Sequence, residues 1–176
     1  MRRLGILSVS LVAVAPLACG GDDGATGPSQ PTGTYVGAWT IRTAAQGVTY
    51  QVVCAGSVQI SSASGGSVSG NFTLGTLQSG SAPPDSAFTC PPATVTGTLS
   101  GSLSGTSLSN VTLDTPAPGT DVWDDAIPDE CDITQPRTFS GTVSGNQLTL
   151  AGSVGVACPG APPAEVTANF SGTKSS

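Results

Sequence analysis

The chain has 176 residues, with five Lys and Arg against eleven Asp and Glu, no histidine, and a formal net charge of −6. Nucleic acids and anionic lipid headgroups attract basic surfaces, so this balance excludes nucleic acid as an expected partner. The lack of histidine removes the most frequent general base and the most frequent metal ligand.

Residues 1–18 have the features of an export signal. Arg2 and Arg3 precede an apolar segment over 4–14, which is shorter than the roughly 20 residues that span a bilayer. Leu17 and Ala18 lead into Cys19, and this end resembles the lipobox of bacterial lipoproteins. The resemblance implies cleavage before Cys19 and attachment of fatty acyl chains such as palmitate to it, so the membrane is the expected partner. The alternative is an ordinary secretory signal with an unmodified cysteine.

Residues 19–33 follow as the modified cysteine and a tether, GGDDGATGPSQPTG, that contains no large apolar side chain and cannot form a core. By analogy with the sorting rule of enteric bacteria, glycine at position 20 favours the outer membrane. We therefore expect a lipid-anchored protein of the bacterial cell envelope, with one β domain over 34–176.

That domain contains strand signals separated by Gly, Ser, Asn and Pro, and no helical periodicity. The alternation of apolar and polar residues predicts strands over 35–42, 49–53, 57–61, 68–74, 94–103, 108–113, 138–143, 147–154 and 165–172. Because short connections favour antiparallel neighbours, we expect an all-β antiparallel meander of about eight to ten strands. Closing the sheet would remove its exposed edges, so a small closed or partly closed barrel is the preferred architecture and a β-sandwich the alternative.

A short repeat, apolar-x-Gly-x-apolar, recurs in these strands, as VSGNF (68–72), VTGTL (95–99), LSGSL (99–103), FSGTV (139–143) and LAGSV (150–154). Glycine inside a strand costs stability, so its recurrence needs an explanation. It indicates either strands that bend and pack closely, as in a closing barrel, or a compositional bias of the sequence.

Four cysteines follow Cys19, and an even number in an exported chain indicates disulfides. Cys131 and Cys158 lie at nearly equal distances from the turn at 144–146, so they should face each other at the open end of a hairpin. Cys54 and Cys90 flank the turn at Gly65 in a similar way, if the segment 75–87 loops out. The predicted pairs are Cys54–Cys90 and Cys131–Cys158.

The first strand, GTYVGAWTI over 33–41, contains Tyr35, Gly37 and Trp39 in the pattern Y-x-G-x-W. This pattern resembles the opening strand of lipocalins and related calycin barrels. The resemblance implies a barrel whose tryptophan closes one end against a basic side chain from the last strand, for which Lys174 is the candidate. It also implies a small apolar ligand in the barrel mouth, although Trp39 is first of all expected to be a core residue.

The segment DVWDDAIPDECD (121–132) carries six acids: Asp121, Asp124, Asp125, Asp129, Glu130 and Asp132. Dense carboxylates can ligate a hard cation, but this spacing matches no calcium loop, so a solvated acidic loop that could meet a partner is preferred and no metal is expected. Trp123 within it is either a lid over the core or an exposed contact residue.

The sequence contains no recognisable catalytic machinery, since its serines have no histidine partner and its acids show no glycosidase-like pairing. We expect a monomeric, non-enzymatic protein without a cofactor. Two functions stay open: binding of a small apolar ligand inside the barrel, and a structural or interaction role that uses the surface loops.

Overall fold

The computed structural model describes residues 31–45, 47–81, 90–116, 122–123, 127, 130–134 and 136–176. The predicted signal segment and Cys19 lie outside these residues. The described residues form nine strands: β1 (Gly33–Ala45), β2 (Val48–Ser64), β3 (Ser67–Ser81), β4 (Val95–Ser104), β5 (Ser107–Asp114), β6 (Asp132–Ile133), β7 (Phe139–Ser144), β8 (Gln147–Ala157) and β9 (Ala164–Lys174).

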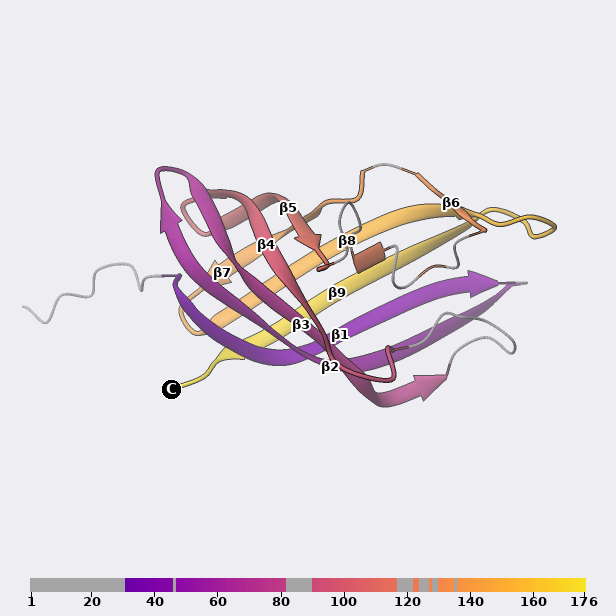
Figure 1. Cartoon of the computed structure of the whole chain (residues 1–176), viewed down its shortest axis with the longest axis horizontal. Coiled ribbons are helices and arrows are strands. Elements are labelled where there is room, and N and C mark those ends of the chain that lie inside the picture. The colour runs from indigo at the N-terminus through magenta and orange to yellow at the C-terminus, as the bar shows by residue number, and fades with distance from the viewer. Residues whose placement is uncertain are drawn as a thin grey trace, which may run out of the picture.

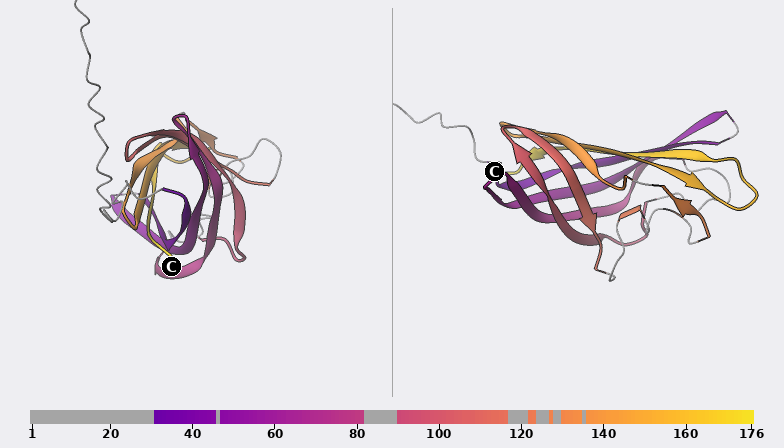
Figure 2. Two further views of the ribbon diagram at one scale, coloured as in Figure 1. Left: turned by 90° about the vertical axis from the view of Figure 1, so that its left-hand side faces the viewer. Right: turned by 90° about the horizontal axis from the view of Figure 1, so that it is seen from above.

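Eight of these strands close into an antiparallel barrel (Figures 1 and 2). Each strand from β1 to β4 pairs with the next, β5 pairs with β7, β7 with β8, β8 with β9, and β9 returns to β1. The two-residue strand β6 adds to β8 where β7 has already ended. The expected all-β antiparallel barrel is therefore confirmed, and the β-sandwich alternative is wrong.

Three details differ from the sequence-based prediction. The two strands expected over 49–53 and 57–61 are one strand, β2, and the apparent break is a set of register shifts around Cys54. Strand β3 continues to Ser81, beyond the loop expected after Leu74. Strand β6 was not predicted, because two residues carry no detectable alternation.

The side chains alternate between an apolar interior and a hydroxyl-rich outer wall, as the period of two requires. Many outward positions carry Ser or Thr, and these side chains pair across neighbouring strands. The oxygen–oxygen distance is 2.9 Å for Ser57–Thr73, 2.9 Å for Ser100–Thr112 and 3.1 Å for Thr142–Thr149. The outer wall thus keeps contact with water mainly through uncharged groups.

The recurring glycines make room for aromatic rings and for neighbouring backbone. A Cβ atom on Gly152 would lie 2.7 Å from Cδ1 of Phe139, and one on Gly97 would lie 2.5 Å from Cε1 of Phe72. A Cβ on Gly141 would collide with the carbonyl of Thr149 on the next strand. The repeat therefore reflects close packing in a closed barrel, which favours the first of its two explanations.

The two ends of the barrel are built differently. At one end, here called the turn end, lie the tight turns at 65–66, 105–106 and 145–146, the start of β1 and the C-terminus. Backbone hydrogen bonds of 2.7–2.9 Å link these turns and termini in sequence around the end: Leu103 N to Gly66 O, Val143 N to Thr106 O, Lys174 N to Asn146 O, and Ser175 N to Thr34 O. A ring of backbone hydrogen bonds therefore forms the rim of the turn end.

Candidate functional site

The opposite end, here called the loop end, holds the long connections. Because the strands alternate in direction, β3, β5 and β8 all end there, and β4, β7 and β9 begin there (Figure 2). Loops on a rigid scaffold are where binding residues most often lie. The loop end is therefore the first place to search for function.

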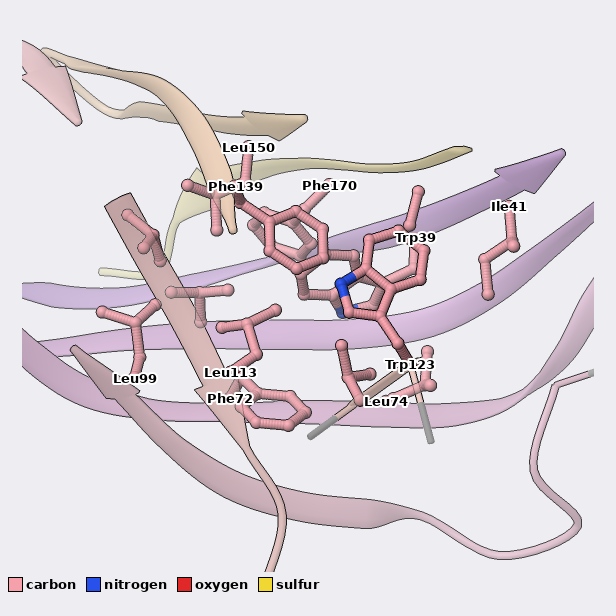
Figure 3. Packing of buried hydrophobic residues seen from close by; sticks show 14 of the residues in the cluster. Trp39, Ile41, Phe72, Leu74, Leu99, Leu113, Trp123, Phe139, Leu150 and Phe170 are labelled. Carbon is pink, nitrogen blue, oxygen red and sulfur yellow. The ribbon is translucent and has the colours of Figure 1, made fainter. Parts of the chain in front are cut away.

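Part of the β5–β7 connection enters the barrel mouth. Val122, Trp123 and Ile127 are buried although they belong to no strand. The indole of Trp123 stacks on the ring of Phe139, with 5.1 Å between the ring centroids and 8° between the planes (Figure 3). Its Nε1 donates a hydrogen bond of 3.2 Å to the carbonyl of Arg137. Trp123 is thus a lid over the core, and we call Val122, Trp123 and Ile127 the plug.

Beneath the plug, aromatic rings fill the interior. Six of the eight aromatic residues of the chain are among its most deeply buried side chains: Tyr35, Trp39, Phe72, Trp123, Phe139 and Phe170. Between Trp39, Trp123, Phe139 and four aliphatic neighbours the described residues leave a cavity of about 10 Å³. That is about the space of one water molecule, so this cavity has no room for an apolar ligand.

Trp39 lies in this core, but its neighbours are not those that the lipocalin resemblance implied. On β9 it faces Phe170, with 5.0 Å between ring centroids, and its Nε1 donates to the carbonyl of Thr73 at 3.0 Å. Lys174 lies four residues further along β9, opposite Tyr35. The expectation that Lys174 packs on Trp39 is therefore wrong.

The other two residues of the Y-x-G-x-W pattern have structural roles at the start of β1. Tyr35 is buried and donates a hydrogen bond of 2.7 Å to the carbonyl of Pro31. This burial raises the pKa of the Tyr35 phenol above its ordinary value of 10.0. Gly37 lets the carbonyl of Ser171 on β9 approach β1 closely, so the pattern helps to join the first and last strands.

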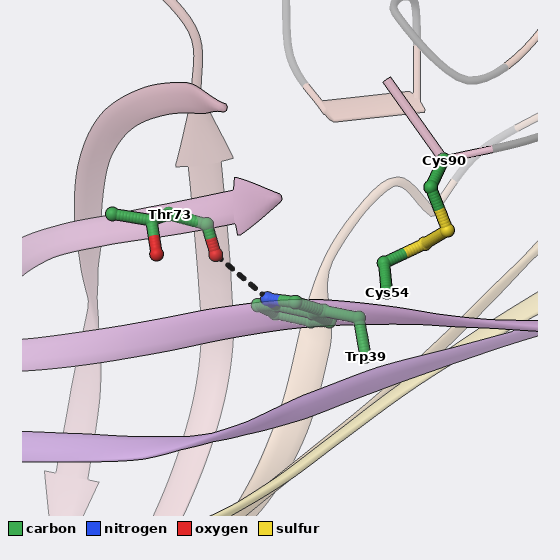
Figure 4. The surroundings of a disulfide bond; sticks show 4 residues. All are labelled: Trp39, Cys54, Thr73 and Cys90. Carbon is green, nitrogen blue, oxygen red and sulfur yellow. Dashed lines mark hydrogen bonds between the residues drawn. A yellow bond between two sulfur atoms is a disulfide. The ribbon is translucent and has the colours of Figure 1, made fainter. Parts of the chain in front are cut away.

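Both disulfides join the predicted pairs of cysteines. Cys54–Cys90 has a Cα–Cα distance of 5.6 Å, and both residues are buried in the core near Trp39 (Figure 4). Cys131–Cys158 has a Cα–Cα distance of 4.2 Å and is only partly buried. It adjoins the pairing of Asp132 with Ala157, which places the two cysteines at the edge of the β6–β8 ladder.

The acidic segment is described only in part. Glu130 and Asp132 are exposed to solvent, whereas Asp121, Asp124, Asp125 and Asp129 lie outside the described residues. Within the described part of the chain no group of three or more His, Cys, Asp or Glu side chains is placed to hold a metal ion. The preference for a solvated or partner-binding loop at 121–132 stays a prediction.

Two open grooves lie on the outer wall. One, of about 440 Å³, runs along β3, β4 and the end of β5 and contains Asp114 among threonines. The other, of about 510 Å³, runs over β1, β7, β8 and β9 and contains Arg42 and Glu165 among Ser, Thr and Asn side chains. Each groove holds a single carboxylate, so neither supplies the carboxylate pair that glycoside hydrolysis requires.

Comparison with known proteins finds no match: no family model, no curated protein and no solved structure matches this chain. In the part of the chain that the structure describes, no helix has the length and apolar character needed to cross a bilayer. Function is therefore inferred from the geometry of this molecule.

Proposed function

We propose that this protein is a non-enzymatic lipoprotein of the bacterial cell envelope, anchored in the outer membrane through Cys19, and that its loop end meets a partner. The observation that carries the proposal is that the two ends of the barrel differ. The chain enters β1 at the turn end, with its ring of hydrogen-bonded turns, and the long connections start from the other end.

The distances fit this arrangement. Pro31, whose carbonyl accepts the Tyr35 hydrogen bond, lies twelve residues after Cys19. At ~3.1 Å per residue an extended tether of this length reaches about 37 Å. Strand β9 has 11 residues, so at ~3.3 Å per residue the barrel wall is roughly 35 Å long before tilt. Because the tether joins the turn end, the loop end is the end of an anchored barrel that can extend farthest from the bilayer.

The filled interior beneath the plug favours one of the two functions that the sequence left open. An apolar ligand in the barrel mouth would have to displace Trp123 from its stack on Phe139. A filled barrel is instead a rigid support, to which the buried plug residues Val122, Trp123 and Ile127 fasten part of the β5–β7 connection. We therefore favour the interaction role over the carriage of a small apolar ligand.

The anchor is tested by cell fractionation of the wild-type protein and of Cys19→Ser. The wild type should partition with the outer membrane and carry acyl mass on its first residue. The variant should be released or stay unprocessed. A wild-type protein that is wholly soluble, with a free thiol at Cys19, would refute the lipoprotein assignment.

The partner-facing end is tested by site-specific photo-crosslinking in intact cells. Ala161, in the exposed β8–β9 turn at the loop end, is compared with Asn146, in the exposed β7–β8 turn at the turn end. We expect a discrete protein or cell-wall adduct from position 161 and none from position 146. Equal labelling from both positions, or labelling from 146 alone, would contradict the proposed orientation.

A further inference from the structure

The two disulfides differ in their access to solvent. Cys54 is 0% exposed and Cys90 is 5% exposed, inside the core. Cys131 and Cys158 are partly exposed at the loop end. Exchange requires a thiolate to reach one of the two sulfur atoms, so a soluble thiol should open Cys131–Cys158 first.

The exposed disulfide lies beside two carboxylates. Cys131 stands between Glu130 and Asp132, both exposed, and Asp132 pairs with Ala157, the residue before Cys158. Both sulfur atoms therefore lie near the same negative charge. The two carboxylates repel an anionic thiol and attract a cationic one.

From these observations we infer that Cys131–Cys158 is a thiol–disulfide exchange site for dithiols with neutral or basic surroundings. The attacking thiolate bonds to Sγ of one of the two cysteines, the disulfide breaks, and the electron pair leaves on Sγ of the other, which takes a proton. The second thiol of the reductant then attacks the mixed disulfide. The reductant leaves as a disulfide, and the cysteine that was attacked becomes a thiol.

The disulfide lies at the end of a short ladder. Next to it, β6 contributes two residue pairs to β8. The Thr134 N–H donates to the Gly155 carbonyl at 2.9 Å, and the Gly155 N–H donates to Thr134 Oγ1 at 3.0 Å. The site does not depend on lipid at Cys19.

The order of opening is measured on the full-length protein, exported to an oxidising compartment and purified in mild detergent. Free thiols are first alkylated, dithiothreitol is added in graded amounts, and new thiols are labelled with a second alkylating reagent and mapped by mass spectrometry. We expect labelling of Cys131 and Cys158 at least tenfold faster than labelling of Cys54 and Cys90. Simultaneous opening, or earlier opening of Cys54–Cys90, would overturn the assignment.

Charge selection is measured with cysteamine, which is cationic, and 2-mercaptoethanesulfonate, which is anionic. One carboxylate about 7 Å from the incoming charge changes each rate by about 1.7-fold near 0.1 M salt. In Asp132→Asn the ratio of the cationic to the anionic rate should therefore fall by about threefold. The matched control is Asp114→Asn, which removes one charge from the end of β5 and should leave the ratio unchanged. An unchanged ratio in Asp132→Asn, or an equal fall in the control, would refute charge selection.

Discussion

Replacement of Trp123 by alanine tests whether the plug is part of the core. The indole is 1% exposed, stacks on Phe139 and donates to the Arg137 carbonyl. Its removal should enlarge the cavity of about 10 Å³ beneath it to roughly 150 Å³, comparable with engineered cavities that bind benzene. A buried Trp→Ala change typically costs about 3–5 kcal/mol, so we expect a loss of about 4 kcal/mol in the free energy of unfolding.

The assay is urea denaturation at constant pH, followed by far-ultraviolet circular dichroism. Because domains of this size have about 5–15 kcal/mol of stability, the variant should still fold and show a lower denaturation midpoint. Indole added to the variant should raise that midpoint, since it refills the apolar cavity. The same indole concentration should leave the wild-type midpoint unchanged.

The matched control is Val122→Ala, in the same plug, where a smaller side chain is removed and about 1–2 kcal/mol should be lost. A loss below about 1 kcal/mol in Trp123→Ala, well under the usual cost of emptying such a site, would show that Trp123 is not a core residue. The plug would then not fill the barrel mouth, and the preference for an interaction role over ligand binding would lose its basis.

Three further predictions concern the barrel itself. Gly152→Ala places a Cβ 2.7 Å from an aromatic ring carbon and should cost about 1–3 kcal/mol by overpacking, whereas Ser153→Ala on the outer face should change the unfolding free energy by less than about 0.5 kcal/mol. Burial raises the pKa of the Tyr35 phenol above 10.0. The buried, protonated phenol therefore contributes its full stability below pH 10.0, and this contribution is lost as the pH rises through the raised pKa. The unfolding free energy measured from pH 8 to 11 should fall in the wild type and fall less in Tyr35→Phe. Joint replacement of Cys54 and Cys90 by alanine removes the disulfide that joins residues 36 positions apart. In the chain-entropy model this should lower the unfolding free energy by about 4 kcal/mol. An unchanged denaturation midpoint would contradict the prediction.

Strand positions could be predicted from the sequence because alternation and turn residues are local signals. The choice between a barrel and a sandwich could not be predicted, because both architectures produce the same alternation in each strand. That choice depends on the pairing of β8 with β9 and of β9 with β1, which brings residues 35–43 against 166–174. Such long-range pairing has no signature within either segment.

The candidate site shows the same division between local and long-range information. The cysteine pairs followed from spacing around turns, which is a local property of hairpins. The partner of Trp39 could not be predicted from such spacing. It depends on the register between β1 and β9, which places Phe170 beside Trp39 and Lys174 nearer the turn end. The role of Trp123 stayed open because one tryptophan among acids has no periodicity; the apolar residues Val122 and Ile127 nearby were the only signal of an inward-facing loop.

The hydrogen bond between Ser175 and Thr34 places the C-terminus beside the start of β1. The two chain ends could therefore be joined by a short linker, and the chain cut instead at the β1–β2 turn around Gly47, at the loop end. Such a circular permutant would keep every strand and both disulfides. With the lipidated tether attached to its new N-terminus, it would stand inverted, with the hydrogen-bonded turns facing away from the bilayer.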